Sequence, residues 1–260
     1  MILIKRKKYD MKKWLKITGL FAFLAIFLTG CSMDDDSGYN FYLGYATTQK
    51  TETGRYDLIL DNGTVMEVTI PMSPYPEGFE FRDNQRVYAN FSILDERTEE
   101  GTLYYRIQLN NIMEILSKKP VYSSRLGESE QQMGNDPIDL TEKWFSGNYL
   151  NVIFEIGVNK EEIIHFINLL VDEDHEGADE DNIYVEVRHN ANGDLTARTA
   201  DGVVSFDVRE FLPEGKTSVT VHISYEMYNG KKITESKVYA RDKVDVNNST
   251  LSAVQRFNIQ

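Results

Sequence analysis

The chain has 260 residues, with 41 acidic residues against 28 basic ones and a formal net charge of −13 at pH 7. A field of that sign repels DNA, RNA and anionic membrane surfaces, so the composition argues against a nucleic-acid partner. The only cysteine is Cys31, which excludes an intramolecular disulfide and leaves stability to packed apolar cores.

Residues 1–30 have the three parts of an export signal. Seven Lys and Arg residues precede an apolar segment of 12 residues, Ile17 to Leu28, and a small-residue cleavage region follows it. Such a segment suits a signal-peptide core and falls short of the roughly 20 residues that span a bilayer as a helix. Met11 would open a more ordinary signal than Met1, so the true start is left open.

The end of this signal, Leu28-Thr29-Gly30-Cys31, resembles the lipobox of bacterial lipoproteins. The resemblance implies cleavage before Cys31 and several acyl chains on it, and more than one chain is needed for stable anchoring. Cys31 is therefore the expected lipid attachment site, and acylation would exclude cysteine catalysis and thiolate metal ligation. Loss of seven basic residues and one acidic residue with the signal changes the net charge from −13 to −19.

Residues 31–38 are predicted to be an acidic tether, because Asp34, Asp35 and Asp36 are consecutive like charges that resist compaction. An acidic run behind a lipidated cysteine also resembles the surface-export signal of Bacteroidetes lipoproteins. The expected location is the cell envelope, with the anchor in the outer membrane. Which face of that membrane carries the protein is left open.

Residues 39–121 predict a small β-barrel domain. Its expected strands cover residues 39–46, 55–60, 64–70, 86–94 and 103–109. Asp61-Asn62-Gly63 predicts a hairpin with a type I′ turn, which needs positive φ at both central residues. Glu99-Glu100-Gly101 marks a second turn, and residues 111–116 fit one or two helical turns or a closing strand.

Residues 122–240 predict a second domain, an antiparallel β-sandwich. Its expected strands cover residues 148–156, 183–188, 204–209, 219–226 and 233–239. Apolar and polar residues alternate along them, which gives each strand one buried and one wet face. Residues 161–170 fit a helix slightly better than a buried strand, and residues 241–260 are a tail of uncertain order. The predicted fold class is all-β.

Several short motifs together resemble the NigD-like family of Bacteroidetes lipoproteins. In chain order they are Asn135-Asp136-Pro137-Ile138, Trp144, residues 147–151, residues 165–169, residues 186–191 and Asp207-Val208-Arg209. The resemblance implies an N-terminal OB-like barrel followed by a C-terminal β-sandwich, and it makes residues 161–170 a strand. The family has no established catalytic residues, so none is carried over. The chain departs from the family pattern in its acidic loop 172–182 and in its tail after Arg241.

No catalytic, cofactor or metal site is predicted. Residues 172–177 match the first half of a calcium loop, but the twelfth position, which needs a bidentate Glu, is Ile183. A solvated hairpin tip is favoured there, and adventitious calcium binding is left open. The four histidines, at 165, 175, 189 and 222, form no closely spaced pair, so a zinc site would need a tertiary coincidence. Charged residues such as Glu155, Glu186 and Asp207 are expected on the surface and not as a glycosidase pair.

Two function classes remain. The first is a lipid-anchored, non-enzymatic cell-envelope protein that binds an unknown protein partner, of the bacteriocin-immunity type that the family name implies. Loops 172–182 and 189–202 are its expected contact surfaces. The alternative is a glycan-binding accessory lipoprotein, in which exposed aromatic rings stack on sugars. The candidate rings are Tyr42, Tyr45, Trp144 and Tyr149.

Overall fold

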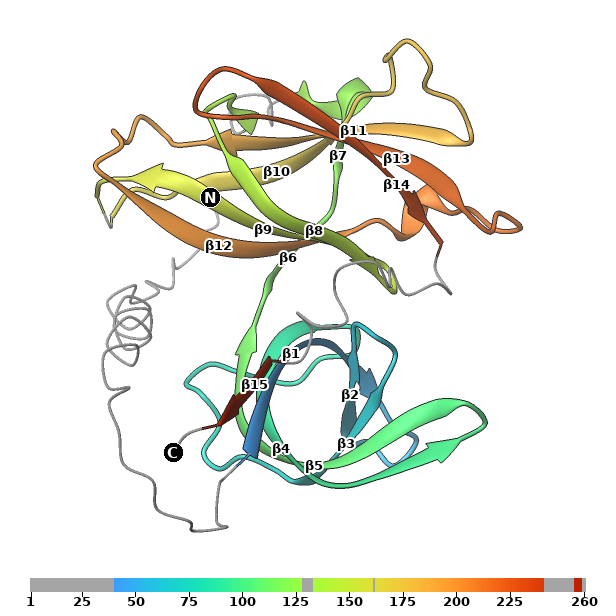
Figure 1. Cartoon of the computed structure of the whole chain (residues 1–260). Helices are drawn as coiled ribbons and strands as arrows, with labels where there is room; N and C mark the ends of the chain where they lie inside the picture. The colour runs from blue at the N-terminus through green and yellow to red at the C-terminus, as the bar shows by residue number, and fades with distance from the viewer. Residues whose placement is uncertain (1–39, 128–132, 161, 241–254, 259–260) are drawn as a thin grey trace, which may run out of the picture. The chain divides into compact units, whose positions relative to one another are not determined.

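The structure is a computed structural model that describes residues 40–127, 133–160, 162–240 and 255–258, and it confirms the all-β fold class (Figure 1). Short 3₁₀ helices at Ser123–Arg125 (η2) and Arg209–Phe211 (η4) interrupt the strands. Within the described ranges, no helix is long and apolar enough to cross a bilayer. The predicted export signal, Cys31 and the tether lie outside the described residues.

The first domain is one six-stranded sheet with the strand order β15-β1-β2-β3-β5-β4. The strands are β1 (Asn40–Lys50), β2 (Tyr56–Leu60), β3 (Val65–Ile70), β4 (Arg86–Glu99), β5 (Thr102–Glu114) and β15 (Gln255–Asn258). Strand β1 pairs with β2 and also with β4, which closes the sheet into a barrel. Part of the tail is therefore a strand, since β15 runs antiparallel to the start of β1. Residues 111–114, left open by the sequence, continue β5.

The hairpin at residues 61–63 is confirmed, but its predicted turn type is wrong. Gly63 has a φ of 85°, whereas Asn62 is not among the residues with positive φ. The Gly63 N–H donates to Leu60 O (2.8 Å) and the Leu60 N–H donates to Thr64 O (2.9 Å). This is a type I turn followed by a left-handed glycine. The type I′ turn lies instead at Glu100 and Gly101, whose φ values of 49° and 84° are both positive.

The second domain is a sandwich of two sheets, as the sequence predicts. The five-stranded sheet has the order β14 (Lys232–Tyr239), β13 (Val219–Glu226), β11 (Asn182–Asn190), β10 (Phe166–Val171) and β7 (Val121–Tyr122). The four-stranded sheet has the order β6 (Leu116–Lys118), β12 (Arg198–Asp207), β9 (Tyr149–Val158) and β8 (Asp139–Ser146). The chain thus enters the sandwich sheets at Leu116, before the expected domain limit at residue 121. The β7–β10, β11–β13 and β6–β12 pairs are parallel, so the prediction of an antiparallel sandwich is wrong for these pairs; alternation alone does not reveal strand direction.

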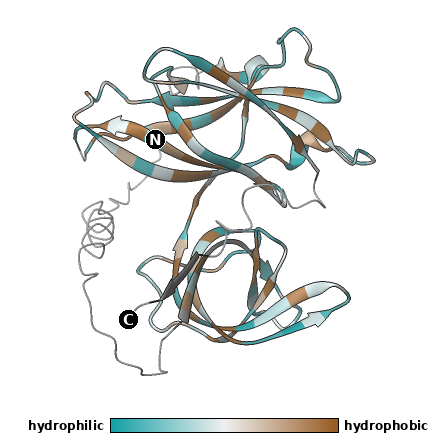
Figure 2. Ribbon diagram, in the orientation of Figure 1, coloured by the Kyte–Doolittle hydropathy of each residue, from teal (hydrophilic) through white to brown (hydrophobic). Residues whose placement is uncertain are grey.

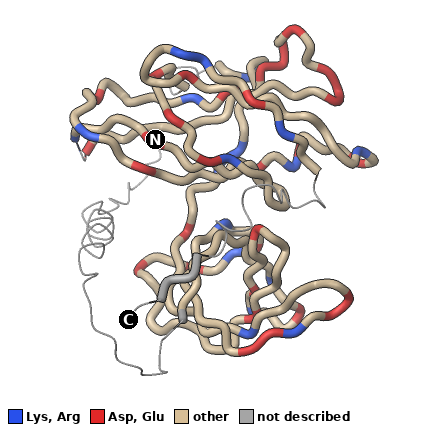
Figure 3. Tube along the Cα trace, viewed as in Figure 1, with Lys and Arg blue, Asp and Glu red and all other residues tan. Residues whose placement is uncertain are grey.

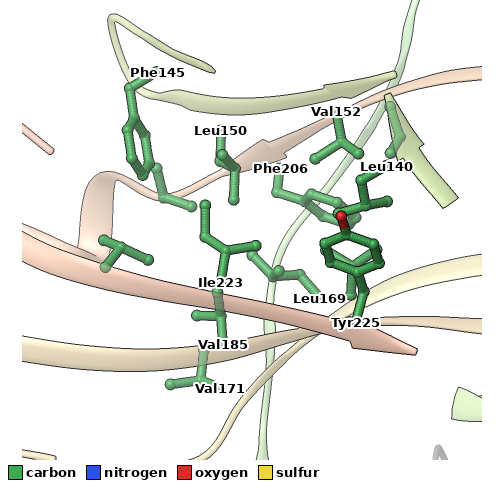
Figure 4. Close-up of a cluster of buried hydrophobic side chains, with 14 of the residues drawn as sticks. Leu140, Phe145, Leu150, Val152, Leu169, Val171, Val185, Phe206, Ile223 and Tyr225 are labelled. Atoms are coloured by element: carbon green, nitrogen blue, oxygen red, sulfur yellow. The ribbon is translucent and has the colours of Figure 1, made fainter. Parts of the chain in front are cut away.

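Facing side chains of the two sheets form the sandwich core, in which Leu150, Val152, Phe206 and Ile223 are fully buried (Figure 4). Brown apolar segments alternate with teal polar ones along the strands in Figure 2, as expected for sheets with one wet face. The segment that fitted both a helix and a strand contains strand β10. Ile167 and its alternating neighbours in β10 point into this core. The strand implied by the family resemblance is confirmed for residues 166–170, whereas residues 162–165 are a turn and irregular chain; the slight preference for a helix is wrong.

A buried ion pair links barrel and sandwich residues. Arg86, the first residue of β4, has no exposed surface, and its guanidinium meets both oxygens of Asp61 at 2.5 and 2.8 Å. From β8, Trp144 Nε1 donates to Asp61 Oδ2 and Ser146 Oγ donates to Asp61 Oδ1, each at 2.7 Å. The described residues of barrel and sandwich accordingly belong to one compact unit. The tight bend at Asp61 places the carboxylate where four donors converge.

Two of the rings proposed for sugar stacking are buried in this region. Trp144 is 5% exposed, and Tyr149 is 4% exposed with its hydroxyl donating to Asn84 O at 2.6 Å. Tyr45 packs against Trp144 with 5.2 Å between ring centroids, and Tyr42 packs against the barrel core. Trp144 and Tyr149 are therefore core aromatics that a sugar does not reach.

Candidate functional site

One end of the sandwich gathers loops whose residues are far apart in sequence. The β9–β10 connection (159–165), the β11–β12 connection (191–197) and the β13–β14 turn (227–231) all lie there. Register places them together, since Arg198 pairs with Val158 and Phe166 pairs with Asn190. We call this set of connections the loop end. It includes the central part of the 189–202 contact surface that the sequence predicts.

Asp194 holds two of these connections together. Its carboxylate Oδ2 accepts the backbone N–H groups of Asn159 (2.7 Å) and Lys160 (3.2 Å) and lies 3.3 Å from His165 Nε2. The Asp194 side chain is 1% exposed, and its second oxygen, Oδ1, has no hydrogen-bond partner among the described residues. Burial alone would raise the pKa of Asp194, but these hydrogen bonds outweigh it and hold the pKa below its usual range.

Two histidines meet next to Asp194. His165 Nδ1 lies 2.9 Å from His189 Nε2, and the rings stack with 5.1 Å between centroids and 16° between planes. His189 is 2% exposed, and its Nδ1 lies 2.9 Å from the carbonyl oxygen of Pro137. Burial is the largest effect and lowers the pKa of His189; the hydrogen bond to Pro137 opposes it, nearby His165 lowers the pKa further, and Asp136 opposes least.

The loop end also carries three exposed apolar side chains. Ile164 is 61% exposed and Leu195 is 75% exposed, each next in sequence to a member of the His165–Asp194 contact. Tyr228 is 41% exposed, and its hydroxyl accepts the backbone N–H of Gly157 in β9. These three are among seven large apolar side chains that are exposed in the described part of the chain, so the loop end concentrates them. Contiguous exposed apolar patches mark interaction sites, and these three side chains are the exposed apolar groups that the loop end offers for one.

The other predicted contact surface, loop 172–182, connects β10 to β11 and carries a concentration of acidic side chains (Figure 3). Its carboxylates are at positions 172, 173, 174, 176, 179, 180 and 181. Hydrogen bonds hold the loop: Glu173 accepts the backbone N–H of Ser124 in η2 at 3.0 Å, and within the loop Asp179 accepts the N–H groups of Asp181 and Asn182 at 2.8 Å. The loop is a structured hairpin tip.

The four histidines fall into two pairs that the sequence did not predict. Besides His165 with His189, the ring of Tyr184 lies between His175 and His222, at centroid distances of 3.7 and 4.3 Å. Among the described residues, no group of three or more His, Cys, Asp or Glu side chains has an arrangement that could hold a metal ion. The register of the β10–β11 hairpin, in which Phe166 pairs with Asn190, is the signal that would have placed His165 beside His189.

A groove of about 280 Å³ lies at the β7 side of the sandwich. It is lined by Lys119, Pro120, Val121, Tyr122, Arg125, Asp207, Arg209 and Glu210. Its charges are largely compensated, since Arg209 Nε lies 2.8 Å from Asp207 and Lys119 Nζ lies 3.9 Å from Glu210. The groove is smaller than most ligand pockets and offers no convergent set of free polar groups. The loop end is the stronger candidate site.

Comparison with solved structures finds the same two-domain fold. A protein from Parabacteroides distasonis described as toxin-related is 25% identical, with a TM-score of 0.63 over 78% of this chain and 94% of that one. A protein of unknown function from Bacteroides vulgatus is 23% identical, with a TM-score of 0.60 over 84% of this chain and 96% of that one. A NigD-like immunity protein from Bacteroides caccae is 19% identical, with a TM-score of 0.59 over 77% of this chain and 97% of that one.

Comparison with curated protein sequences found no match. Two family models match instead, the NigD-like N-terminal OB domain over residues 45–115 and the NigD-like C-terminal β-sandwich domain over residues 122–250. Together they span most of the chain and follow the barrel and the sandwich described above. The chain therefore belongs to the NigD-like family, in agreement with the resemblance found in its sequence.

Proposed function

We propose that this protein is a lipid-anchored, non-enzymatic cell-envelope protein that binds a protein partner through the loop end of its sandwich. One observation carries the proposal. Ile164 and Leu195 are largely exposed, although the connections that bear them are joined by hydrogen bonds to the carboxylate of Asp194. A surface that is apolar and already ordered binds at a low entropic cost, because little conformational freedom is lost on association.

The anchor is the second part of the proposal. The lipobox-like sequence ending in Cys31 would fix the protein to the outer membrane, and residues 31–38 would hold the two β-domains away from it. Residues 39–121 and 122–240 are the domain limits that we propose for the exported part.

A protein partner of the toxin type is the specific form we favour. Two structural relatives are described as toxin-related and as an immunity protein, and we extend that role to this chain as a proposal. The net charge of −19 after signal removal favours a neutral or basic partner. Long-range attraction would raise the association rate, and salt would weaken it.

The experiment uses immobilised residues 39–260 to retain partners from culture supernatant and envelope extract of competing strains. Wild type is compared with the double variant Ile164→Ser/Leu195→Ser. Val238→Ser is the matched control, because Val238 is 62% exposed and lies near the end of β14, away from the β13–β14 turn.

The proposal expects one defined protein that wild type and Val238→Ser retain equally and that the double variant loses. Retention that does not depend on Ile164 and Leu195 would contradict a loop-end site. A retained glycan in place of a protein would favour the accessory-lipoprotein alternative. Hydrolysis of any substrate that one carboxylate change abolishes would replace binding with catalysis.

A further inference from the structure

We infer that two copies of this chain pair through the open edge of β14, in antiparallel orientation and with Ser236 at the two-fold axis. The five-stranded sheets of the two copies then continue into each other across the dimer. The pairing follows from the neighbours, backbone directions and charges of β14, and it does not depend on the loop-end partner proposed above.

β14 is the sheet edge of the sandwich that lacks protection. In the described part of the chain, the other three edge strands are β7 with two residues, β6 with three and β8 with eight. The pairing of β8 shifts its register between Leu140 and Glu142, as at a β-bulge. β14, dark red in Figure 1, has eight residues and pairs with β13 without a shift. Short or bulged edges resist a further strand, whereas a long regular edge is a template for one.

The backbone groups on the open edge belong to the even-numbered residues of β14. In β13 the Thr220 N–H donates to Asp181 O at 2.8 Å, on the side of β11. The Met227 N–H, just after β13, donates to Lys231 O at 3.0 Å, on the side of β14. Directions alternate along a strand and odd residues of β13 pair with odd residues of β14, so the odd residues of β14 bond to β13. The residues whose backbone groups point outward are therefore Thr234, Ser236 and Val238.

The charges of β14 select one register for a second copy. Only even residues can bond across the edge, so even residues must lie opposite even residues. With Ser236 opposite Ser236 of the second copy, Glu235 lies opposite Lys237, and symmetry repeats this pair. The next register in either direction places Glu235 opposite Glu235 or Lys237 opposite Lys237. Opposite charges across two strands stabilise the pairing and like charges destabilise it. Lys232 is already bonded to Glu186 at 3.0 Å and lies opposite no charged residue.

The side chains of β14 are available for this contact. The Glu235 side chain is 47% exposed although one of its oxygens lies 3.0 Å from Lys143 Nζ, so it can also meet Lys237 of the second copy. Val238 is 62% exposed, and in this register Thr234 of the second copy covers it. β-Branched pairs of this kind pack well on a sheet face. The contact is small beside a standard stable interface, so the dimer is weak and depends on concentration.

Disulfide cross-linking of single-cysteine variants tests the register, since residues 39–260 contain no cysteine. Ser236→Cys places two thiols opposite each other, with about 5.5 Å between Cα atoms, and this separation suits a disulfide. Mild oxidation should therefore give a covalent dimer. Thr234→Cys and Val238→Cys should each stay monomeric, because like positions lie roughly 14 Å apart along the strands. A mixture of these two variants should cross-link, since the two positions lie opposite each other.

A charge variant tests what selects the register. Light scattering of residues 39–260 from micromolar to near-millimolar concentration, at a physiological salt concentration that screens the net charge, measures the dimer. Lys237→Glu puts a carboxylate opposite Glu235 twice and leaves the Lys143–Glu235 pair in place. It should raise the dissociation constant at least about tenfold. Lys237→Arg keeps the charge and should dimerise like wild type.

Three results would overturn the pairing. The first is a Ser236→Cys variant that cross-links no faster than Thr234→Cys alone. The second is equal dimerisation of Lys237→Glu and wild type. The third is a purified protein that stays monomeric while a different envelope protein cross-links to Ser236→Cys, which would assign the open edge to another occupant. Loss of the loop-end partner in the retention experiment would leave all three measurements unchanged.

Discussion

Replacing Asp61 by Asn removes the negative charge that compensates a fully buried arginine. Asp61 Oδ1 accepts from Arg86 and Ser146, and Oδ2 accepts from Arg86 and Trp144, at 2.5 to 2.8 Å. An amide in that position keeps one acceptor oxygen and turns an NH₂ group toward donors. The Arg86 charge, with no exposed surface, is left unpaired.

Breaking one partner of a buried ion pair costs about 3–5 kcal/mol. At about 2–4 °C per kcal/mol for a protein of this size, Asp61→Asn should lower the Tm by about 6–20 °C. The matched control is Asp95→Asn, because Asp95 meets Arg106 at 2.7 Å but both side chains are about half exposed. Exposed pairs of this kind contribute only about 0–1 kcal/mol, so the control should change the Tm by a few degrees at most.

Tryptophan fluorescence during urea unfolding of residues 39–260 measures this loss of stability directly. Trp144 is the only tryptophan in that range, and its indole N–H bonds Asp61, so the probe sits in the perturbed network. Wild type should unfold in one transition, and Asp61→Asn should lose stability and cooperativity between barrel and sandwich. If Asp61→Asn costs no more than Asp95→Asn, the reasoning from burial is wrong. A double variant Asp61→Ala/Arg86→Met, which removes both charges, should cost less than the two single changes added together.

Three further predictions concern the anchor, a glycine and the pH dependence. Cys31→Ala should abolish labelling with palmitate and release the protein from the membrane fraction; a labelled, membrane-bound variant would refute the lipobox. Gly134→Ala should destabilise the sandwich by roughly 1–3 kcal/mol in urea unfolding, because Gly134 has a φ of 62° and a Cβ there would lie 2.5 Å from His189 O. The free energy of unfolding should fall as the pH drops below about 6.5, since the lowered pKa values of His189 and, at more acidic pH, Asp194 both favour proton uptake on unfolding. His189→Gln should reduce the fall in unfolding free energy just below pH 6.5. An unchanged pH dependence in this variant would contradict its assignment to His189.

Local pattern determined much of this protein from its sequence alone. Along Val219–Glu226, alternation of apolar and polar residues predicts a strand with one buried face, and the observed burial alternates residue by residue. Asn229-Gly230 and Glu100-Gly101 mark turns because a glycine tolerates positive φ, and both glycines have it. These features need only neighbouring residues, so the sequence contains them completely. The order of its short motifs also identified the family.

Only the tertiary structure revealed the features that depend on contacts between residues distant in sequence. The pattern of residues 161–170 fits a helix and a strand almost equally well locally, and pairing of β10 with β11 makes residues 166–170 a strand. The turn at Asp61 is type I and not the type I′ turn that Asn62-Gly63 favours. In this turn the Asp61 carboxylate bonds to Arg86 and to Trp144, which is 83 residues away in the sequence. His165 and His189 are 24 residues apart and meet only through strand register. Which side chains become buried together is a property of the packed sheets, because periodicity shows that a face is buried but not what it faces.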